Sequence, residues 1–523
     1  MDSITTASSQ VKGFLGLFLG SPFKFALTLL GLLLWTAIHR LYFSSISHIP
    51  GPKLAAITQL YEIYYDVYLG GKFTLHLESL HKQYGPIIRI NPWEIHINDP
   101  HFYDEIYTTV RPFNKVFEHI SWVNLFTAGL ATVPHSLHKM RRSAISPLFS
   151  KQQIYILQSE IQDRAAKLCN RFLYEYKSTG KAVSLERAFG CYATDVVTHY
   201  TFAREYKYLD FPDFIAPTLE TARMFAALIH VIRLFPVFRI ISQNMPNRLV
   251  AFMVPGLGHF FAFQDDMFRQ VTDIISGRNQ DHVNVSHKTI FHEVLSSNLP
   301  PREKLVPRLA DEGMVLVLAG FETTRSVLTN TCFYILNDKE VCRKLKAELA
   351  AAWPDIENPP TLQELERLPY LTAIIQEGLR LSLGVSFRLP RTSPTPIQYG
   401  SYTIPPGAIF SMCQYFVATN STIFPSPKTF DPTRWLADPI TGEMPLAPDG
   451  KLLSRYQVSF SRGTRSCVGM NLAYAELHIC LANVFRKCEL QLFETTVKDI
   501  EFNRDYFLPR AHPDSKGVRA LVV

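Results

Sequence analysis

The stretch that decides the fold lies near the C-terminus and reads Phe460-Ser-Arg-Gly463-Thr-Arg465-Ser-Cys467-Val-Gly469. Cys467 comes directly before an apolar helical run, so its sulfur can lie at the positive N-terminus of a helix, which lowers the pKa of a thiol. Gly463 and Gly469 let the backbone approach a flat cofactor closely, and Arg465 offers a fork for a carboxylate such as a haem propionate. A thiolate held in this way can ligate haem iron and favour O–O cleavage. The alternative is a buried structural cysteine in a glycine-containing loop.

This segment resembles the cysteine-ligand signature of the cytochrome P450 superfamily, F-x-x-G-x-R-x-C-x-G, and every fixed position is matched. Four other segments resemble marks of that family and stand in the expected order. They are His138-Lys-Met-Arg-Arg142 (W-x-x-x-R, with His for Trp), Ala319-Gly320-Phe-Glu322-Thr323-Thr324 (the oxygen-activating helix), Glu377-Gly-Leu-Arg380 (E-x-x-R) and Phe430-Asp-Pro432-Thr-Arg434-Trp435 (the meander).

The resemblance extends from about Ile49 to the C-terminus. The Pro50-Gly51-Pro52 hinge and the segment Tyr84–Glu94 are similar to the fungal membrane-bound branch, and within it to the trichodiene-oxygenase-like enzymes of secondary metabolism. The resemblance therefore implies the cytochrome P450 fold, mainly α with small β-sheets, preceded by one N-terminal transmembrane helix.

The hydrophobic pattern predicts the same architecture from the residues themselves. Ile87–Ile97 is typical of two short strands with a turn at Asn91-Pro92, and most of residues 151–337 has apolar residues at helical spacing. Leu305–Asn337 favours one helix, with Pro307 in its first turn. Prolines crowd after Arg380 and indicate short strands and loops before the helix returns at Ala473–Phe485.

Composition excludes several classes of protein. The 523 residues are 47% apolar and 19% charged, which excludes disorder and coiled coils. The net charge of 53 − 46 = +7 is mild and not concentrated in a run, so no nucleic-acid partner is expected. Eight scattered cysteines without a C-x-x-C pair give no support to a zinc ribbon, a thioredoxin-like site or a disulfide scaffold.

The N-terminus predicts a membrane anchor. Between Gly13 and Ile38 the only formal charge is Lys24, and Phe25–Ile38 is densely apolar. Extension of this run to about residues 14–40 reaches the roughly 20 residues that a bilayer requires. A cleaved signal peptide and a buried core helix are the alternatives, and the flanking charges leave the orientation open. We expect an anchor over residues 1–44 and a haem-thiolate monooxygenase domain over 45–523.

The resemblance also implies the roles of the site residues. Cys467 would be the axial ligand of the iron of haem b. Glu322 and Thr323 would deliver protons at a point where Gly320, which costs about 1 kcal/mol against Ala, lets the helix bend or approach something closely. Propionates would be held by Arg142, Arg465, His138 and Arg391, with Arg388 competing for the last role. The remaining cofactor contacts would come from Ala319, Gly320, Phe460 and Gly469.

Glu377 and Arg380 lie at i,i+3 on one predicted helix. Such pairs are usually solvated and contribute roughly 0.2–0.5 kcal/mol. Because Arg434 matches the third family position, we expect a buried triad that supports the haem loop and has no chemical role.

Three apolar segments, Arg111–Phe126, Phe202–Phe238 and Leu383–Phe387, are expected to line the substrate pocket by analogy with the family, although each could be ordinary core. Met224–Phe238 could also lie against the membrane surface. Few charges occur in these segments, so we expect a neutral, mostly hydrocarbon substrate of terpenoid or polyketide size.

Together these features predict a monooxygenase that inserts one atom of O2 into an apolar small molecule. No G-x-G-x-x-G fingerprint occurs, so electrons would come from an NADPH-cytochrome P450 reductase. The resemblance places the protein in the endoplasmic reticulum membrane as a single-pass protein, with its catalytic domain facing the cytosol and in contact with lipid. The rival functions are a haem-thiolate isomerase or dehydratase and a non-catalytic haem-binding protein.

Overall fold

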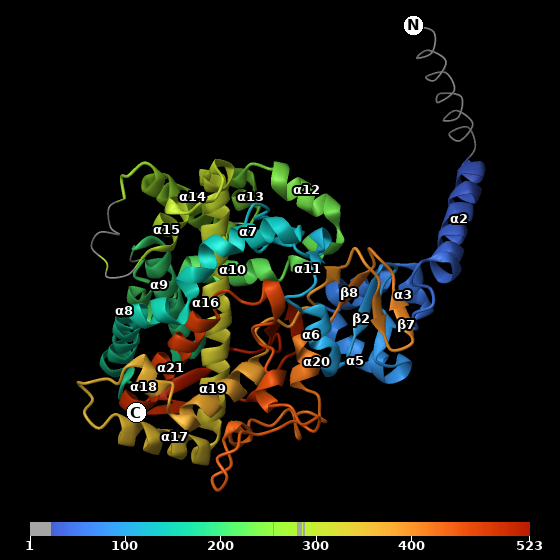
Figure 1. The fold of residues 1–523 in the computed structure, drawn as a ribbon. Helices are drawn as coiled ribbons and strands as arrows, with labels where there is room; N and C mark the ends of the chain where they lie inside the picture. The colour runs from blue at the N-terminus through green and yellow to red at the C-terminus, as the bar shows by residue number, and fades with distance from the viewer. Residues whose placement is uncertain (1–21, 205, 255, 280–284, 286–287) are drawn as a thin grey trace.

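The computed structural model describes residues 22–204, 206–254, 256–279, 285 and 288–523, and it is mainly helical with small sheets, as predicted (Figure 1). Helix α16, Val306–Asn337, runs through the middle of the molecule with a proline in its first turn. Its 32 residues confirm the long helix predicted over Leu305–Asn337.

The other helices follow the predicted order. Those N-terminal to α16 are α3 Lys53–Ile57, α4 Leu60–Ile63, α5 Phe73–Tyr84, α6 Tyr103–Ile106, α7 His135–Ile145, α8 Lys151–Arg171, α9 Leu185–Phe202, α10 Pro217–Ala226, α11 Ile229–Leu234, α12 Pro236–Asn244, α13 Asn247–Met253, α14 Leu257–Ile275 and α15 Ile290–Ser296. Those C-terminal to it are α17 Lys339–Ala352, α18 Leu362–Leu365, α19 Pro369–Ser382, α20 Gln414–Ala418 and α21 Met470–Lys487.

The largest sheet has five strands in the order β1-β2-β8-β5-β3. Its members are β1 Ile87–Arg89, β2 Glu94–Ile97, β8 Ile409–Ser411, β5 Arg391–Thr392 and β3 Asn114–Lys115, so the two strands predicted over Ile87–Ile97 are confirmed. Strands β3 and β5 pair antiparallel with Lys115 opposite Arg391, which brings two cations together.

Three smaller sheets lie elsewhere in the fold, in the orders β4-β12-β9, β6-β7 and β10-β11. Their strands are β4 Val183–Ser184, β6 Ile397–Tyr399, β7 Tyr402–Ile404, β9 Leu490–Leu492, β10 Arg504–Tyr506, β11 Leu508–Arg510 and β12 Arg519–Val522. The hairpin formed by β10 and β11 turns at Phe507.

The N-terminal helix stands away from the body of the protein (Figure 1). Helix α2, Pro22–Ile38, continues as a π-helical turn to Phe43, and these 22 residues have a mean hydropathy of 1.4 with none buried. At 1.5 Å per residue the segment is about 33 Å long, enough to cross the hydrocarbon core. The alternative of a buried core helix is therefore wrong for residues 22–43, whereas the predicted start at residues 14–21 lies outside the described residues.

Helices α16 and α9 pack closely at Gly320. A Cβ atom at this position would lie 3.0 Å from Cγ2 of Val197, which is closer than side-chain carbons normally approach. The close approach predicted at Gly320 is therefore a helix–helix contact.

Candidate active site

The loop before α21 holds Cys467 at its tip. The backbone N–H of Cys467 donates to the carbonyl oxygen of Phe460 at 2.8 Å, which closes the loop on itself. Gly463 has φ +70°, and a Cβ there would lie 2.4 Å from the carbonyl oxygen of Thr108. No other residue fits at that position without displacing the backbone, so the sequence of the loop fixes its shape.

The thiol of Cys467 is accessible, and yet its surroundings raise its pKa. Its side chain is exposed, yet burial raises its pKa because many protein atoms surround the sulfur. The N–H of Gly469 and the charge of Arg142 act in the opposite direction but do not outweigh burial. The prediction of a lowered thiol pKa is therefore wrong for the protein without a cofactor.

A cluster of basic side chains, of which His138 is neutral, lies near Cys467. It comprises Lys115 of β3, His138 and Arg142 of α7, Arg391 of β5, and Arg465 of the cysteine loop; we call these five residues the cationic cluster. Burial and mutual repulsion lower the pKa of His138 to about 2 and that of Arg465 to about 9, and they hold the pKa of Lys115 well below its usual range.

The cationic cluster makes no hydrogen bond or ion pair with a carboxylate in the part of the chain that the structure describes. Lys115 donates to the carbonyl of Leu130 at 2.7 Å, Arg465 to those of Thr132 and Val133 at 2.6 and 2.8 Å, and Arg142 to that of Ser466 at 2.6 Å. The buried Nε of Arg465 and Nδ1 of His138 have no hydrogen-bond partner among the described residues.

Buried charges normally pair with opposite charges. A site with several cations beside an accessible thiol and no acidic partner fits an anionic group with two carboxylates, such as haem with its propionates. The predicted propionate residues Arg142, Arg391, Arg465 and His138 are all brought together. The competitor Arg388 is not, since it is fully buried elsewhere between Glu62 and Glu94.

One face of α16 is accessible, although the helix runs through the middle of the molecule. Ala319 is exposed although α16 is central, Thr323 one turn later is half-buried, and the hydroxyl of Thr323 donates to the carbonyl of Ala319 at 2.7 Å. Gly320 lies on another face and packs against Val197.

Glu322 is held away from Thr323. Its carboxylate is buried and accepts hydrogen bonds from Arg325 at 2.5 and 3.1 Å and from Arg510 of β11. The two arginines lower its pKa to about 2 despite burial. The structure therefore has an ionised, doubly paired Glu322 and no hydrogen bond between the predicted acid and the predicted hydroxyl.

The triad of Glu377, Arg380 and Arg434 is formed. Glu377 is 0% and Arg380 1% exposed, and the carboxylate accepts from Arg380 at 2.7 and 2.8 Å and from Arg434 at 3.0 Å. The surface-pair alternative is therefore wrong. Helix α19 also contacts the chain just before the cysteine loop, because the hydroxyl of Ser459 donates to the carbonyl of Leu379 at 2.9 Å.

Sequence reasoning missed Lys115 as a member of the cationic cluster. The residue lies in a segment expected to contact substrate, and nothing in its neighbourhood in the sequence marks it as a partner of Arg391. Only the pairing of β3 with β5, two strands of two residues each, places the two side by side.

The fold and this site define a protein of the haem-thiolate class. The model of the cytochrome P450 family matches residues 50–514. The chain is 41% identical to "Cytochrome P450 monooxygenase sdnE" of Sordaria araneosa, over 95% of this chain and 96% of the relative. It is 39% identical to "Tryptophan 6-hydroxylase fscE" of Fusarium equiseti (93% and 94%) and 38% identical to "N-acetyltryptophan 6-hydroxylase ivoC" of Emericella nidulans (94% of each).

The chain therefore belongs to the cytochrome P450 family. It is an oxidoreductase of the monooxygenase type, with haem b bound through a cysteine thiolate as its cofactor. The isomerase, dehydratase and carrier alternatives are not favoured, since these relatives are named as monooxygenases or hydroxylases.

Proposed function

We propose that Cys467 is the axial ligand of the haem iron and that the cationic cluster holds the two propionates. The observation that carries the proposal is the group of buried and half-buried basic side chains beside an accessible thiol, with no acidic partner among the described residues. Ala319, Phe460 and Gly469 would contact the haem, and Gly320 would contribute by letting α16 approach α9. The triad of Glu377, Arg380 and Arg434 would support the cysteine loop from behind.

When bound, the haem supplies the binding and reductive activation of O2. The residues of α16 handle protons and water. Thr323 can turn its hydroxyl away from the carbonyl of Ala319, toward the accessible face of α16, and donate a proton at Oγ1. Glu322 can exchange protons only after it leaves Arg325 or Arg510, because the paired carboxylate stays ionised.

The substrate pocket would be formed where the three expected segments meet. The rings of Trp122 and Phe507 lie 5.0 Å apart, Phe387 is 6.3 Å from Phe507, and His230 is 6.3 Å from Phe387. These residues come from all three segments and from the β10–β11 hairpin. An aromatic and apolar wall of this kind suits a neutral, mostly hydrocarbon compound, and we propose a terpenoid or polyketide intermediate of fungal secondary metabolism.

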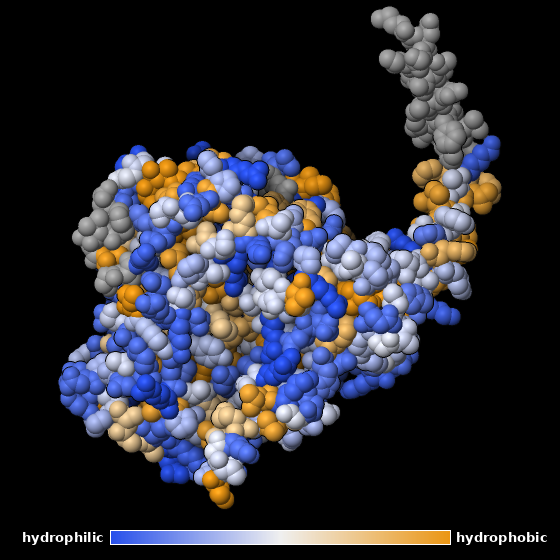
Figure 2. Space-filling view, in the orientation of Figure 1, coloured by the Kyte–Doolittle hydropathy of each residue, from blue (hydrophilic) through white to orange (hydrophobic). Residues whose placement is uncertain are grey.

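The membrane would be contacted by two surfaces. Figure 2 shows hydrophobic side chains along α2 and over α12. On α12 and α13, Val237, Phe238, Ile240 and Phe252 are 50–83% exposed. We propose that residues 1–44 anchor the domain formed by residues 45–523 in the endoplasmic reticulum membrane on its cytosolic side, where an NADPH-cytochrome P450 reductase supplies electrons.

The experiment that tests this function uses the full-length protein with a fungal reductase. The reduced, carbon monoxide-bound protein should show the strongly red-shifted Soret band of a thiolate-ligated haem, and Cys467→Ser should abolish it. Cys413→Ser is the matched control, since Cys413 is buried beside His96 with its sulfur 3.3 Å from Nε2. A band that survives in Cys467→Ser would refute the ligand, and product mass spectrometry against terpenoid and polyketide panels would identify the substrate class.

A further inference from the structure

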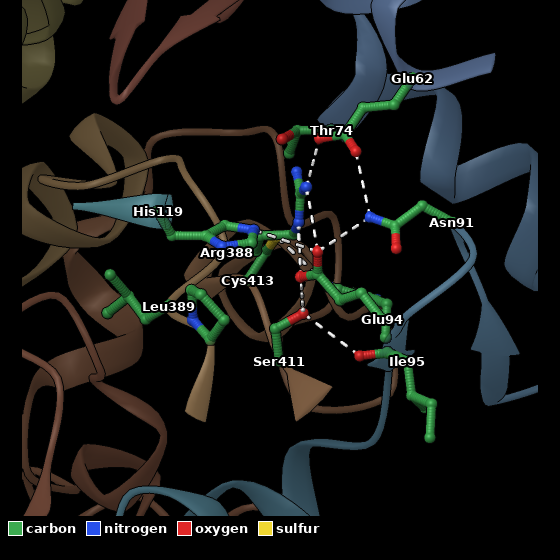
Figure 3. Close-up of polar contacts among 12 residues, drawn as sticks. Glu62, Thr74, Asn91, Glu94, Ile95, His119, Arg388, Leu389, Ser411 and Cys413 are labelled. Carbon is green, nitrogen blue, oxygen red and sulfur yellow. Dashed lines mark hydrogen bonds and ion pairs between the residues drawn. The ribbon is translucent and has the colours of Figure 1, made fainter. Parts of the chain in front are cut away.

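A second cluster of charged residues lies between the large sheet and α11, and it has no counterpart among the predicted site residues. Figure 3 shows its centre at Glu94, Arg388, His119 and Asn91. No member is more than 8% exposed. We call it the buried polar network; its members are Glu62, Asp66, Asn91, Glu94, His119, His230, Arg233, Arg388, Ser411 and Asp505.

Glu94 is its most connected member. It accepts hydrogen bonds from Arg388 at 2.7 Å and Ser411 at 3.0 Å, and from Asn91 at 3.1 Å, and it lies 3.1 Å from Nε2 of His119. These partners come from four separate segments of the chain, so the position of each depends on the others.

Two side chains of α11 reach into the network. Arg233 pairs with Glu62 at 2.7 Å and with Asp66 at 3.0 Å. His230 lies 3.2 Å from Asp66 and hydrogen-bonds the carbonyl of Asp505 at 2.5 Å. Helix α11 is thereby fixed to α4, to the π-helical turn Tyr64–Tyr68 that follows it, and to the β10–β11 hairpin.

Asp505 connects the network to the tip of this hairpin. Its carboxylate accepts from Thr74 at 2.5 Å, from Ser386 at 2.9 Å and from the backbone N–H of Phe507 at 3.0 Å. Phe507 has φ +71°, a left-handed conformation that is uncommon for a bulky residue. Its carbonyl in turn accepts from the N–H groups of Ser386 and Phe387.

Every segment expected to line the substrate pocket contributes to this arrangement. His119 belongs to the first segment, His230 and Arg233 to the second, and Ser386 to the third, while Asp505 belongs to the hairpin. Three rings pack against this arrangement and form the aromatic wall, defined as Trp122, Phe387 and Phe507. Phe387 touches the network directly, since the guanidinium groups of Arg233 and Arg388 lie over its ring at 5.2 and 4.9 Å.

The hairpin that carries Phe507 of the aromatic wall contacts α16. Arg510, three residues after Phe507 along the hairpin, pairs with Glu322 of α16. Three residues of strand span about 10 Å. The tip of the hairpin is therefore held close to the segment of α16 that contains Glu322 and Thr323.

The composition of the network indicates that it fixes the positions of its members more than it stabilises the fold. It contains four carboxylates, two arginines and two histidines, all desolvated. Buried ion pairs are often no more stabilising than apolar residues of the same volume, but they demand one arrangement of their partners. We propose that the buried polar network positions the aromatic wall, and that Asp505 is the positioning residue that holds Phe507 in its left-handed conformation at the substrate pocket.

The proposal rests on the proposed haem-thiolate function, and azole ligands test the two separately. Imidazole binds haem iron, and we expect it to be too small to reach the aromatic wall. Clotrimazole, a triarylmethyl imidazole, is expected to extend from the iron over the substrate pocket. In Asp505→Ala, release of the left-handed tip should weaken clotrimazole binding by a factor of about 5–30, since that is the population change for the cost of this conformation. Soret titration of imidazole should change less than about twofold, because its binding does not depend on the wall.

Asp505→Asn should restore clotrimazole binding, since the amide oxygen can still accept from Phe507. Lys82→Ala, which removes only the exposed pair with Glu78, is the surface control. If Asp505→Ala fails to fold, Ser386→Ala combined with Thr74→Val removes two of the three hydrogen bonds instead. Unchanged clotrimazole affinity in a folded, haem-loaded variant would overturn the positioning role, whereas absence of any imidazole shift in the native protein would overturn the haem function.

Discussion

Replacement of Lys115 with Met should accelerate the loss of haem without destabilising the protein that lacks haem. In the protein alone, the ammonium donates to the carbonyl of Leu130 at 2.7 Å and stands opposite Arg391. Burial and the charges of Arg391, Arg465 and Arg142 all disfavour its charged form. The substitution removes one hydrogen bond, of about 0.5–1.5 kcal/mol, and also removes this repulsion, so the two effects offset each other.

With haem bound, the proposed pairing with a propionate would make the charge of Lys115 favourable. An ammonium that pairs with a carboxylate contributes about 1.5–3 kcal/mol, which corresponds to about ten- to hundredfold weaker haem retention when it is lost. Lys115→Arg keeps the charge and should retain most of the haem affinity. The effect therefore depends on the bound cofactor, unlike that of an ordinary core substitution.

Haem transfer from the purified holoprotein to an excess of a haem-free globin measures the effect as a change in absorbance with time. Lys139→Met is the matched control, because Lys139 lies on α7 beside His138 but is exposed. Equal rates of haem loss in the native protein and in Lys115→Met would refute the proposal that Lys115 helps to hold the propionates.

Four further outcomes are expected. Thr323→Ala should bind haem and substrate but divert reducing equivalents to peroxide, so the ratio of product to NADPH consumed should fall; an unchanged ratio would remove Thr323 from proton delivery. Glu377→Ala should lose about 3–5 kcal/mol of stability, because the buried Arg380 loses the carboxylate with which it pairs, and haem content after thermal challenge measures this against the exposed control Glu340→Ala. The pKa of Glu322 is lowered from 4.5 to about 2, so its ion pairs stabilise the protein above pH 4.5 and lose this effect as the pH falls through 2. The melting temperatures of the native protein and of Glu322→Gln should therefore converge at acid pH. A difference that stays constant with pH would contradict the pairing. Removal of residues 1–44 should leave haem binding intact and reduce the need for detergent, whereas loss of haem would mean that this segment packs into the core.

The sequence predicts most of the fold because its signals are local. The long apolar pattern of α16 with a proline in the first turn, and the two strands around Asn91-Pro92, depend on residues within a few positions of one another. The cysteine loop is equally local as a motif, although the steric demand for glycine at position 463 comes from the carbonyl oxygen of the distant Thr108. Such features can be read without knowing which segments meet.

The triad could be predicted only by combining local spacing with family order. Glu377 and Arg380 are three residues apart, and spacing alone favours a solvated pair. The burial of Glu377 depends on Arg434 and Trp435, which arrive from 57 and 58 positions further along the chain. The match of Arg434 to the family motif supplied the information that spacing lacks.

The buried polar network could not be predicted, because most of its contacts join distant segments. Arg388 lies 294 positions from Glu94 and 326 from Glu62. In the sequence, Arg388 and Arg391 differ little: both follow α19 and both are candidates for a propionate. The register of the strands gives them different partners. Arg391 lies on β5 opposite Lys115 of β3. Arg388 lies three residues earlier, before β5 begins, and pairs with Glu62 and Glu94.

Glu322 illustrates how a correct motif can still misplace a side chain. The sequence puts an acid next to Thr323, but adjacent residues on a helix point about 100° apart. Thr323 therefore shares a face with Ala319, whereas Glu322 turns toward Arg325 on its own helix and Arg510 on the hairpin. Because Arg510 follows the tip that Asp505 is proposed to position, we expect a substrate that moves Phe507 to disturb the pair of Arg510 with Glu322 as well. The residues proposed for proton delivery and for substrate contact are thus joined by one short hairpin.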